Sequence, residues 1–281
     1  MAKGSMRVRL GVALAGLMAV SSCGALGTGK EPPVENLSAE QIYNKAEYEL
    51  ETKRDPTEAA ALFGEVERLY PYSEWAKRAL IMQAYSYHRD RDYENARVAA
   101  QRYIDFYPAD EDAAYAQYLL ALSYYDQLDL VGRDQGLTYQ ALQALRTVIE
   151  RYPDSEYAKS AILKFDLAFN HLAAKEMEVG RYYLKGGHYT AAISRFRAVV
   201  EDFQTTTHTP EALYRLIECY LALGLDGEAQ TAAAILGYNF RGSQWYEDGY
   251  NLLRGKGLAP EARSTSWLGT VYRQTVRGEW L

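Results

Sequence analysis

The segment RLYPYSEWAKRAL, residues 68–80, ends one amphipathic run and begins another. Proline cannot continue a helix, and it disfavours the helical conformation in the residue before it, so the pattern breaks at Tyr70-Pro71. Ser73 can then accept a hydrogen bond from the free N–H groups of the next helix, and Glu74 favours the positive end of that helix. We therefore interpret the segment as a junction between two helices rather than as a catalytic loop.

This junction recurs along the chain. DFYPADEDAAYAQYL (105–119) and ERYPDSEYAKSAIL (150–163), with Ser155 as a second capping candidate, are close copies; EDFQTTTHTPEALY (201–214) and NFRGSQWYEDGY (239–250) are weaker ones. Five copies in register predict five pairs of antiparallel helices stacked into an all-α solenoid. An alanine lies about twelve residues before each junction, at Ala59, Ala96, Ala141, Ala192 and Ala229, and about twelve residues earlier a small residue precedes an aromatic one, clearest in Ala84 with Tyr87 and Gly180 with Tyr183.

The spacing of the copies is uneven, since successive junctions counted from residue 71 lie 37, 45, 51 and 37 residues apart. We place about eight extra residues of the third repeat in the loop 126–137. The excess of 14 in the fourth repeat precedes Gly180 and lengthens its first helix by about four turns, to roughly 30 residues. In the fifth repeat Ile217 occupies the position of the small residue. A final helix at about 244–254 should cover the last apolar face.

The first residues have the composition of a secretory signal. Lys3, Arg7 and Arg9 precede an uncharged apolar run, residues 10–20, which is shorter than the roughly 20 residues of a membrane span. The end of this run, Val-Ser-Ser before Cys23, resembles the lipobox of bacterial lipoproteins. The resemblance implies cleavage before Cys23, a diacylglycerol on its sulfur and an acyl chain on its new amino group. Gly24 favours the outer membrane by analogy with lipoprotein sorting; the alternative is a free thiol in a soluble secreted protein.

These patterns divide the chain into five parts. Glycine and proline within residues 24–37, together with the absence of an apolar period, indicate a flexible tether between the lipid and the helices. The parts are a signal peptide (1–22), the lipidated tether (23–37), repeats one to three (38–153), the long linking helix with repeats four and five and the capping helix (154–254), and a C-terminal tail (255–281) to which we assign no role.

Composition argues against several classes of function. The chain has 37 acidic and 31 basic residues, and loss of residues 1–22 leaves a net charge of −9, whereas nucleic-acid binders need a basic surplus. The four histidines lie in different repeats without the spacing of a zinc site, and neither a glycine-rich phosphate loop nor a GxSxG motif occurs. Cys219 is the only other cysteine, so we expect no disulfide framework. We expect no enzymatic activity, no metal and no cofactor except the lipid on Cys23.

The order of small residue, aromatic, alanine and proline resembles the tetratricopeptide repeat. Together with the lipobox and the stretched helix, residues 38–253 resemble the BamD family, lipoproteins of the machinery that folds β-barrels into the outer membrane of Gram-negative bacteria. The resemblance implies a non-enzymatic, periplasm-facing scaffold whose partners are a BamA-like barrel-forming subunit, other assembly lipoproteins and unfolded barrel clients. The alternatives are another periplasmic repeat lipoprotein, such as a pilus-secretin assembly factor or a cell-wall coordinator, and, as the weakest, an enzyme.

The first helix of each pair lines the concave side in such repeats, so the register predicts a groove on repeats one to three. This surface is aromatic with two arginines, and it suits an extended peptide with aromatic side chains and a terminal carboxylate. The alternative for any single tyrosine is packing between repeats. The candidates for the client-peptide groove are Asn44, Tyr48, Arg78, Tyr85, His88, Arg89, Tyr115, Tyr118 and Tyr125, with Ile81 and Asp126 at further inward positions.

The resemblance also implies that an arginine on the second helix of repeat four faces the barrel-forming subunit. Arg195 lies at this place, with Arg197 close by, and neither has an acidic residue three or four positions N-terminal to it. An arginine without a local partner is more available for a bidentate contact with another protein. We therefore assign Arg195 and Arg197 to partner binding; the alternative is that Arg195 is a solvated helix residue.

Overall fold

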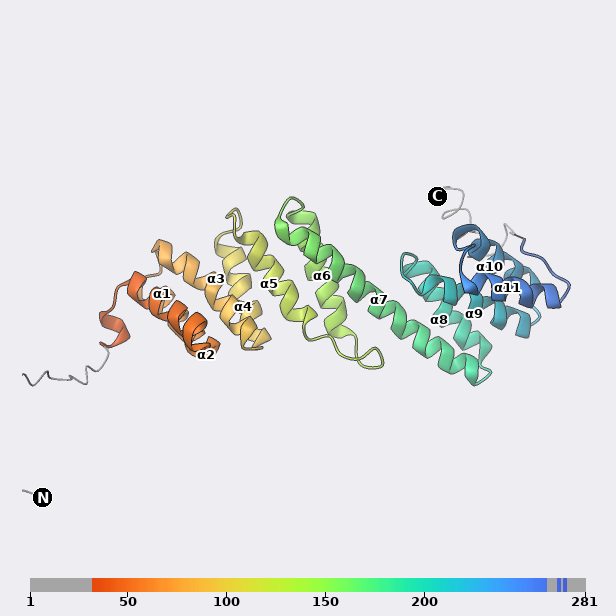
Figure 1. The fold of residues 1–281 in the computed structure, drawn as a ribbon, viewed down its shortest axis with the longest axis horizontal. Helices are drawn as coiled ribbons and strands as arrows, with labels where there is room; N and C mark the ends of the chain where they lie inside the picture. Colours follow the sequence, from red (N-terminus) through yellow and green to blue (C-terminus); the bar gives the residue numbers. More distant parts are fainter. Residues whose placement is uncertain (1–31, 262–266, 269, 272–281) are drawn as a thin grey trace, which may run out of the picture.

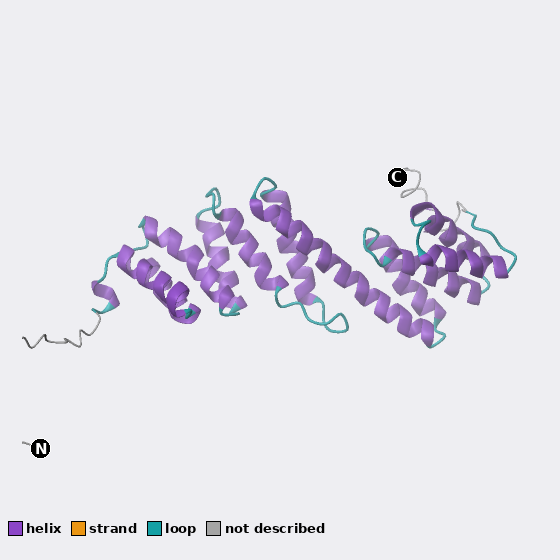
Figure 2. Cartoon of the chain, viewed as in Figure 1, coloured by secondary structure: helices purple, strands orange, loops and turns teal. Residues whose placement is uncertain are grey.

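The computed structural model describes residues 32–261, 267–268 and 270–271. Helices joined by loops make up the described part of the chain, and the secondary structure there includes no strand (Figure 2). The helices are α1 (Ala39–Tyr48), α2 (Pro56–Leu69), α3 (Glu74–Arg89), α4 (Tyr93–Phe106), α5 (Ala113–Tyr125), α6 (Gly136–Arg151), α7 (Glu156–Lys185), α8 (Tyr189–Asp202), α9 (Thr209–Ala222), α10 (Asp226–Asn239) and α11 (Gln244–Gly255), with a 3₁₀ turn at Val34–Asn36 and a π-helical turn at Glu49–Lys53.

The helices stack in chain order into one elongated row (Figure 1). Each helix from α1 to α10 packs against the next one along the chain, and α1, α3, α5 and α7 also contact one another in succession. The first helices of the pairs therefore share one side of the array. This arrangement confirms the predicted all-α repeat fold with five helix pairs and a final helix.

The predicted small residues lie where helices cross. The five alanines that precede the junctions are fully buried, as is Ala84. A Cβ atom added to Gly180 would lie 2.5 Å from Phe196 Cε1 of α8, so only glycine fits between these helices. In the fifth repeat Ile217 fills the small position, and the close approach is instead allowed by Gly249 of α11, where a Cβ would lie 2.9 Å from Ile217 Cδ1.

The serines at the junctions do not all act as predicted. Ser73 Oγ accepts from the backbone N–H of Ala76 at 3.1 Å, which confirms the expected N-cap. Ser155 makes no such bond, and its hydroxyl donates instead to the carbonyl oxygen of Tyr152 at 2.8 Å, so its predicted capping role is wrong. A serine hydroxyl can make both bonds at once, since Ser73 Oγ also donates to the carbonyl oxygen of Tyr70 at 2.9 Å; at Ser155 only the bond to the preceding turn forms.

The long helix has the length that the spacing predicts. α7 contains 30 residues, and it packs on both α6 and α8 and so joins the two parts of the array (Figure 1). The extra residues of the third repeat lie in the loop between Tyr125 and Gly136. Lys175 Nζ of α7 donates to the carbonyl oxygen of Gly132 at 2.6 Å, which holds this loop against the long helix.

The end of the expected tether is ordered. Val34 and Leu37 pack against the apolar core of the first repeat, and Tyr70 donates from its hydroxyl to the carbonyl oxygen of Leu37 at 2.6 Å. The flexible segment therefore cannot extend to residue 37, because the apolar side chains at its end bury against α1 and α2. The signal peptide and Cys23 lie outside the described residues.

The chain after α11 contributes to the C-terminal core, which the sequence analysis does not foresee. Gln230 Nε2 of α10 donates to the carbonyl oxygen of Ala259 at 2.8 Å, and Leu268 is fully buried. Among the described helices, none combines the length and the apolar character that a membrane crossing requires.

Candidate client groove and partner surface

The predicted groove residues lie on the first helices of repeats one to three. Tyr85, Tyr115, Tyr118 and Tyr125 are half-buried, whereas Tyr48 is 53% exposed. α1 carries Asn44 and Tyr48, α3 carries Arg78, Ile81, Tyr85, His88 and Arg89, and α5 carries Tyr115, Tyr118 and Tyr125, with Asp126 directly after it.

A cluster of tyrosines forms the middle of this surface. The ring of Tyr157, from α7, has its centroid 5.1 Å from that of Tyr115 and 5.5 Å from that of Tyr118. Tyr85 of α3 lies close enough to influence the pKa of Tyr115. Tyr157 is not among the predicted groove residues because the predicted groove was limited to repeats one to three, although the residue stands in the quoted junction ERYPDSEYA.

Burial controls the chemistry of these tyrosines. Burial raises the pKa of Tyr115, Tyr118 and Tyr125, and together with a hydrogen bond to Glu156 it raises the pKa of Tyr157 to about 12. The hydroxyls therefore stay neutral at physiological pH. The structure is compatible with both roles considered for these tyrosines, the lining of a peptide groove and packing between repeats. The rings pack between repeats, while part of each side chain stays at the surface.

The two groove arginines, which the sequence analysis treats alike, differ in their contacts. Arg89 Nη1 pairs with Glu51 Oε1 at 3.1 Å and the Arg89 guanidinium lies 5.7 Å from the centroid of the Tyr85 ring, so its charge is partly neutralised. Arg78 stacks on Trp75 at 5.5 Å and forms no ion pair with any described residue. Arg78 is thus the more available of the two arginines.

Two further contacts connect the repeats along the groove. His88 Nε2 lies 3.0 Å from Asp126 Oδ2, which joins repeats two and three. Lys164 Nζ of α7 lies 4.9 Å from the centroid of the Tyr125 ring, so the long helix also brings a cation to this surface.

The two arginines assigned to the partner surface are not without partners. Arg195 Nη1 lies 3.1 Å from Glu176 Oε2 of α7, and Arg197 pairs with Glu201 at 2.9 Å on its own helix. The expectation that the two arginines are unpaired is therefore wrong. Glu201 lies four residues C-terminal to Arg197, whereas only N-terminal positions were considered. Glu176 lies on another helix, so the spacing around Arg195 does not reveal it. Both arginines keep almost half of the side chain exposed, at 45% and 44%.

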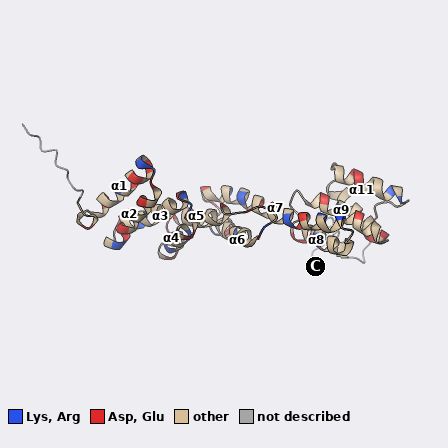
Figure 3. Ribbon diagram, turned by 90° about the horizontal axis from the view of Figure 1, so that it is seen from below, with Lys and Arg blue, Asp and Glu red and all other residues tan. Residues whose placement is uncertain are grey.

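Charge of both signs is spread along the whole row of helices (Figure 3). The described residues contain no group of three or more His, Cys, Asp or Glu side chains that could hold a metal ion. Cys219 is buried, and burial raises the pKa of its thiol to about 12.

Residues 35–235 match the YfiO family, which is described as outer membrane lipoprotein. This chain belongs to the YfiO family. The match spans all five repeats up to α10, so the family assignment rests on the array as a whole.

Curated relatives agree with this family assignment. The chain is 47% identical over 246 residues to the outer membrane protein assembly factor BamD of Caulobacter vibrioides, covering 87% of this chain and 80% of the relative. It is 42% identical to the BamD of Rickettsia prowazekii (76% and 84% covered) and 31% identical to that of Neisseria meningitidis serogroup A (79% and 88% covered).

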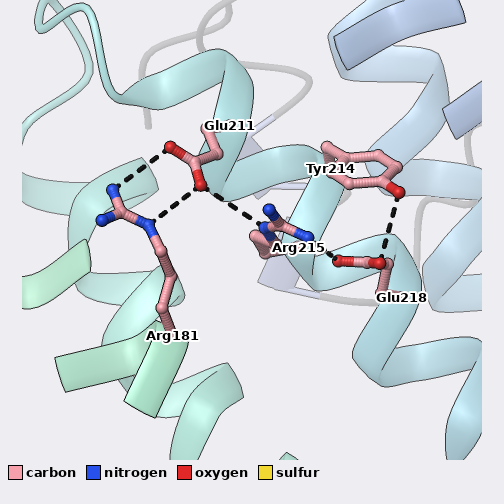
Figure 4. Close-up of polar contacts among 5 residues, drawn as sticks. All are labelled: Arg181, Glu211, Tyr214, Arg215 and Glu218. Atoms are coloured by element: carbon pink, nitrogen blue, oxygen red, sulfur yellow. Dashed lines mark hydrogen bonds and ion pairs between the residues drawn. The ribbon is translucent and has the colours of Figure 1, made fainter. Parts of the chain in front are cut away.

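In this YfiO family member the first helices of the C-terminal repeats carry an ion-pair network that the sequence analysis missed (Figure 4). Arg181 of α7 pairs with Glu211 of α9 at 3.0 Å, Glu211 also lies 3.4 Å from Arg215, and Arg215 pairs with Glu218 at 2.7 Å. Tyr214 donates to Glu218 at 3.2 Å. The spacing of Glu211, Arg215 and Glu218 on one helix face was the available signal. Each charge in the network has a partner within it, so the network connects α7 to α9 and presents no unpaired charge to a ligand.

Proposed function

We propose that this chain is a non-enzymatic scaffold of an outer-membrane β-barrel assembly complex. The observation that carries the proposal is the likeness to a curated outer membrane protein assembly factor over 87% of the chain. A stack of helix pairs with a tyrosine-lined first-helix side supports it, since solenoids of this kind offer extended surfaces to other proteins.

The scaffold is held at the outer membrane by lipid chains on Cys23 and faces the periplasm. Two or more chains give stable anchoring where one gives marginal binding. The segment between Cys23 and Val34 then sets how far the first repeat stands from the lipid surface.

Repeats one to three bind the unfolded barrel client. The half-buried rings of Tyr85, Tyr115 and Tyr118, with Tyr157 of α7 beside them, offer rigid stacking surface to the aromatic side chains of an extended peptide. Arg78, which has no ion-pair partner among the described residues, is suited to the peptide's carboxylate.

Repeats four and five bind the BamA-like barrel-forming subunit, and other assembly lipoproteins join the complex. Arg195 and Arg197 are the contact residues on α8. Their intramolecular partners, Glu176 and Glu201, are carboxylates at the surface that a partner's carboxylate can replace.

A pull-down of tagged protein from detergent-solubilised envelopes tests this function. We expect a large outer-membrane barrel protein to be recovered with the wild type and to be reduced with Arg195→Glu, while the charge-reversed Arg133→Glu, on the exposed loop before α6, recovers it normally. Recovery of a pilus secretin instead would favour the alternative repeat lipoprotein, and normal recovery with Arg195→Glu would assign that arginine to the solvated surface.

A further inference from the structure

The chain after α11 turns back over the C-terminal repeats. Glu261 donates its backbone N–H to the carbonyl oxygen of Gln230 at 3.3 Å, and Gln230 Nε2 donates to the carbonyl oxygen of Ala259 at 2.8 Å. Further along, Leu268 is fully buried and Val271 is 7% exposed, both within the core of the C-terminal repeats. The tail is therefore attached to the array at several separate points.

Trp267 is the point at which this tail meets α8 and α9. Its indole Nε1 donates to the hydroxyl of Tyr220 at 3.1 Å, and the Arg197 guanidinium lies 4.5 Å from the centroid of its ring. Burial raises the pKa of Tyr220 to about 12, and the oxygen of its neutral hydroxyl accepts the bond from the indole. Trp267 is thus fixed from one side by α9 while its ring supports Arg197 from another.

This arrangement restricts the orientation of Arg197. An indole ring is the best cation–π partner for a guanidinium, and the carboxylate of Glu201 holds the same group at 2.9 Å. Five N–H donors are present in a guanidinium, so donors remain for a further carboxylate. Arg197 is 44% exposed and Trp267 is half-buried, and these two residue types are among those that dominate binding energy at protein interfaces.

We propose that the tail is part of the partner surface, because Trp267 holds Arg197 in the orientation that receives a carboxylate of the partner protein. The partner segment carries an acidic side chain, which Arg197 binds. Trp267 acts as a positioning residue for Arg197. This inference rests on the proposed function of repeats four and five.

Binding of the purified barrel-forming subunit to the purified, lipidated full chain in detergent tests the proposal. We expect Trp267→Ala and Arg197→Ala each to weaken binding by roughly tenfold or more, and Trp267→Phe, which keeps a stacking ring, to weaken it by no more than about threefold. The double variant should bind about as weakly as Arg197→Ala alone, since Trp267 acts through that arginine.

Trp245→Ala is the matched control. Trp245 of α11 also stacks with an arginine, Arg215, at 5.5 Å, but it lies on the first-helix side of the same repeats. This variant removes the same side chain and the same kind of stack away from α8, so its binding should equal that of the wild type. Melting curves of all variants identify any general loss of folding.

The outcomes distinguish a failure of the proposed partner from a failure of the positioning role of Trp267. No binding by the wild type overturns the proposed partner together with this inference. If Arg197→Ala weakens binding and Trp267→Ala does not, the positioning role of Trp267 is overturned, while the proposed partner stands. Losses that multiply in the double variant show that Trp267 acts independently of Arg197, and this contradicts the proposal. A loss in Trp245→Ala equal to that in Trp267→Ala shows a general effect of removing a tryptophan from these repeats, which contradicts the proposal as well.

Discussion

Gly180 illustrates how a single residue sets the geometry of this array. Its backbone lies against the Phe196 ring, and a Cβ would approach three ring atoms to within 2.9 Å or less, at the point where the long helix crosses α8. Ring atoms in a packed core cannot move far, because protein interiors have the density of organic crystals. The close crossing of α7 and α8 therefore depends on the absence of a side chain at residue 180 as well as on the ring of Phe196.

Replacement of Gly180 by alanine should therefore destabilise the protein. We expect the free energy of unfolding to fall by about 1–3 kcal/mol, since the methyl group forces α7 and α8 apart and this cost exceeds the helix propensity that alanine adds. Urea unfolding measures it. Gly255→Ala, at the end of α11 with nothing within 4 Å of the added Cβ, is the control. Equal midpoints for both variants would contradict the close-packing explanation.

The tyrosines of the groove can be tested at the same scale. Tyr85→Ala combined with Tyr118→Ala should weaken binding of a peptide that copies the C-terminal strand of a barrel protein by roughly tenfold or more, at about 1 kcal/mol for each aromatic contact. Fluorescence anisotropy with a labelled peptide measures the change. Tyr72→Ala removes a fully exposed tyrosine at a junction and should have no effect. Unchanged binding by the folded double variant would exclude these residues from the client site.

At the scale of helices, the array is held by polar contacts at the junctions as well as by apolar packing. Asp110, in the junction before α5, accepts from Lys77 of α3 at 2.8 Å and from the hydroxyl of Tyr103 of α4 at 2.7 Å. The bonds from Lys77 and Tyr103 lower the pKa of Asp110 to about 2. One carboxylate thereby connects three consecutive elements.

This carboxylate should make stability depend on pH. Because its folded pKa is below the ordinary value of 3.8, Asp110 stabilises the fold at pH values above about 4, and the contribution is lost as the pH falls toward about 2. Asp110→Asn should lower the free energy of unfolding at pH 7 by about 1–2 kcal/mol and should flatten its decrease between pH 4 and 2. Asp105→Asn, in the same repeat but exposed, is the control. Parallel pH profiles for wild type and Asp110→Asn would contradict this role.

The last helix and the tail have a shared role at this scale. α11 contacts both α9 and α10, and the fully buried Leu253 joins it to the C-terminal core. Deletion of residues 244–281 should expose this core and clearly lower solubility and the melting temperature, because terminal repeats need a covering element. Leu253→Ala should destabilise the protein less than the deletion does, and we expect it to lower the free energy of unfolding by about 2–4 kcal/mol. A deletion variant that melts like the intact protein would show that repeat five is stable without this cover.

At the scale of the whole molecule, the long helix divides the groove from the partner surface while joining them in one body. α7 supplies Tyr157 and Lys164 to the tyrosine surface at one end, and Gly180 and Arg181 to the C-terminal repeats at the other. Because α7 is one continuous helix of 30 residues packed on both parts of the array, it holds the proposed client and partner sites at a fixed separation.

The proposed lipid on Cys23 attaches the whole molecule to the membrane. Cys23→Ser should release the protein from the outer membrane or leave it unprocessed, because the residue that would carry the lipid is lost. Membrane fractionation and incorporation of labelled palmitate measure the outcome. Cys219→Ser, a change at the buried cysteine, is the control and should leave attachment intact. Continued membrane attachment and labelling of Cys23→Ser would contradict lipidation at this position.

The helix pairs, their register and the length of α7 follow from local patterns in the sequence. Junctions such as Tyr70-Pro71-Tyr72-Ser73 act over a few residues, and small residues such as Ala84 and Gly180 mark helix crossings at a fixed spacing, so both leave a local pattern. Which side chains meet depends instead on the three-dimensional packing of the helices. Arg195 and Glu176 are 19 residues apart, and Trp267 and Tyr220 are 47 apart. These contacts depend on how the helices stack and where the chain returns after α11, and no periodicity along the chain encodes them. For this reason the contact between Trp267 and Arg197 was not foreseen.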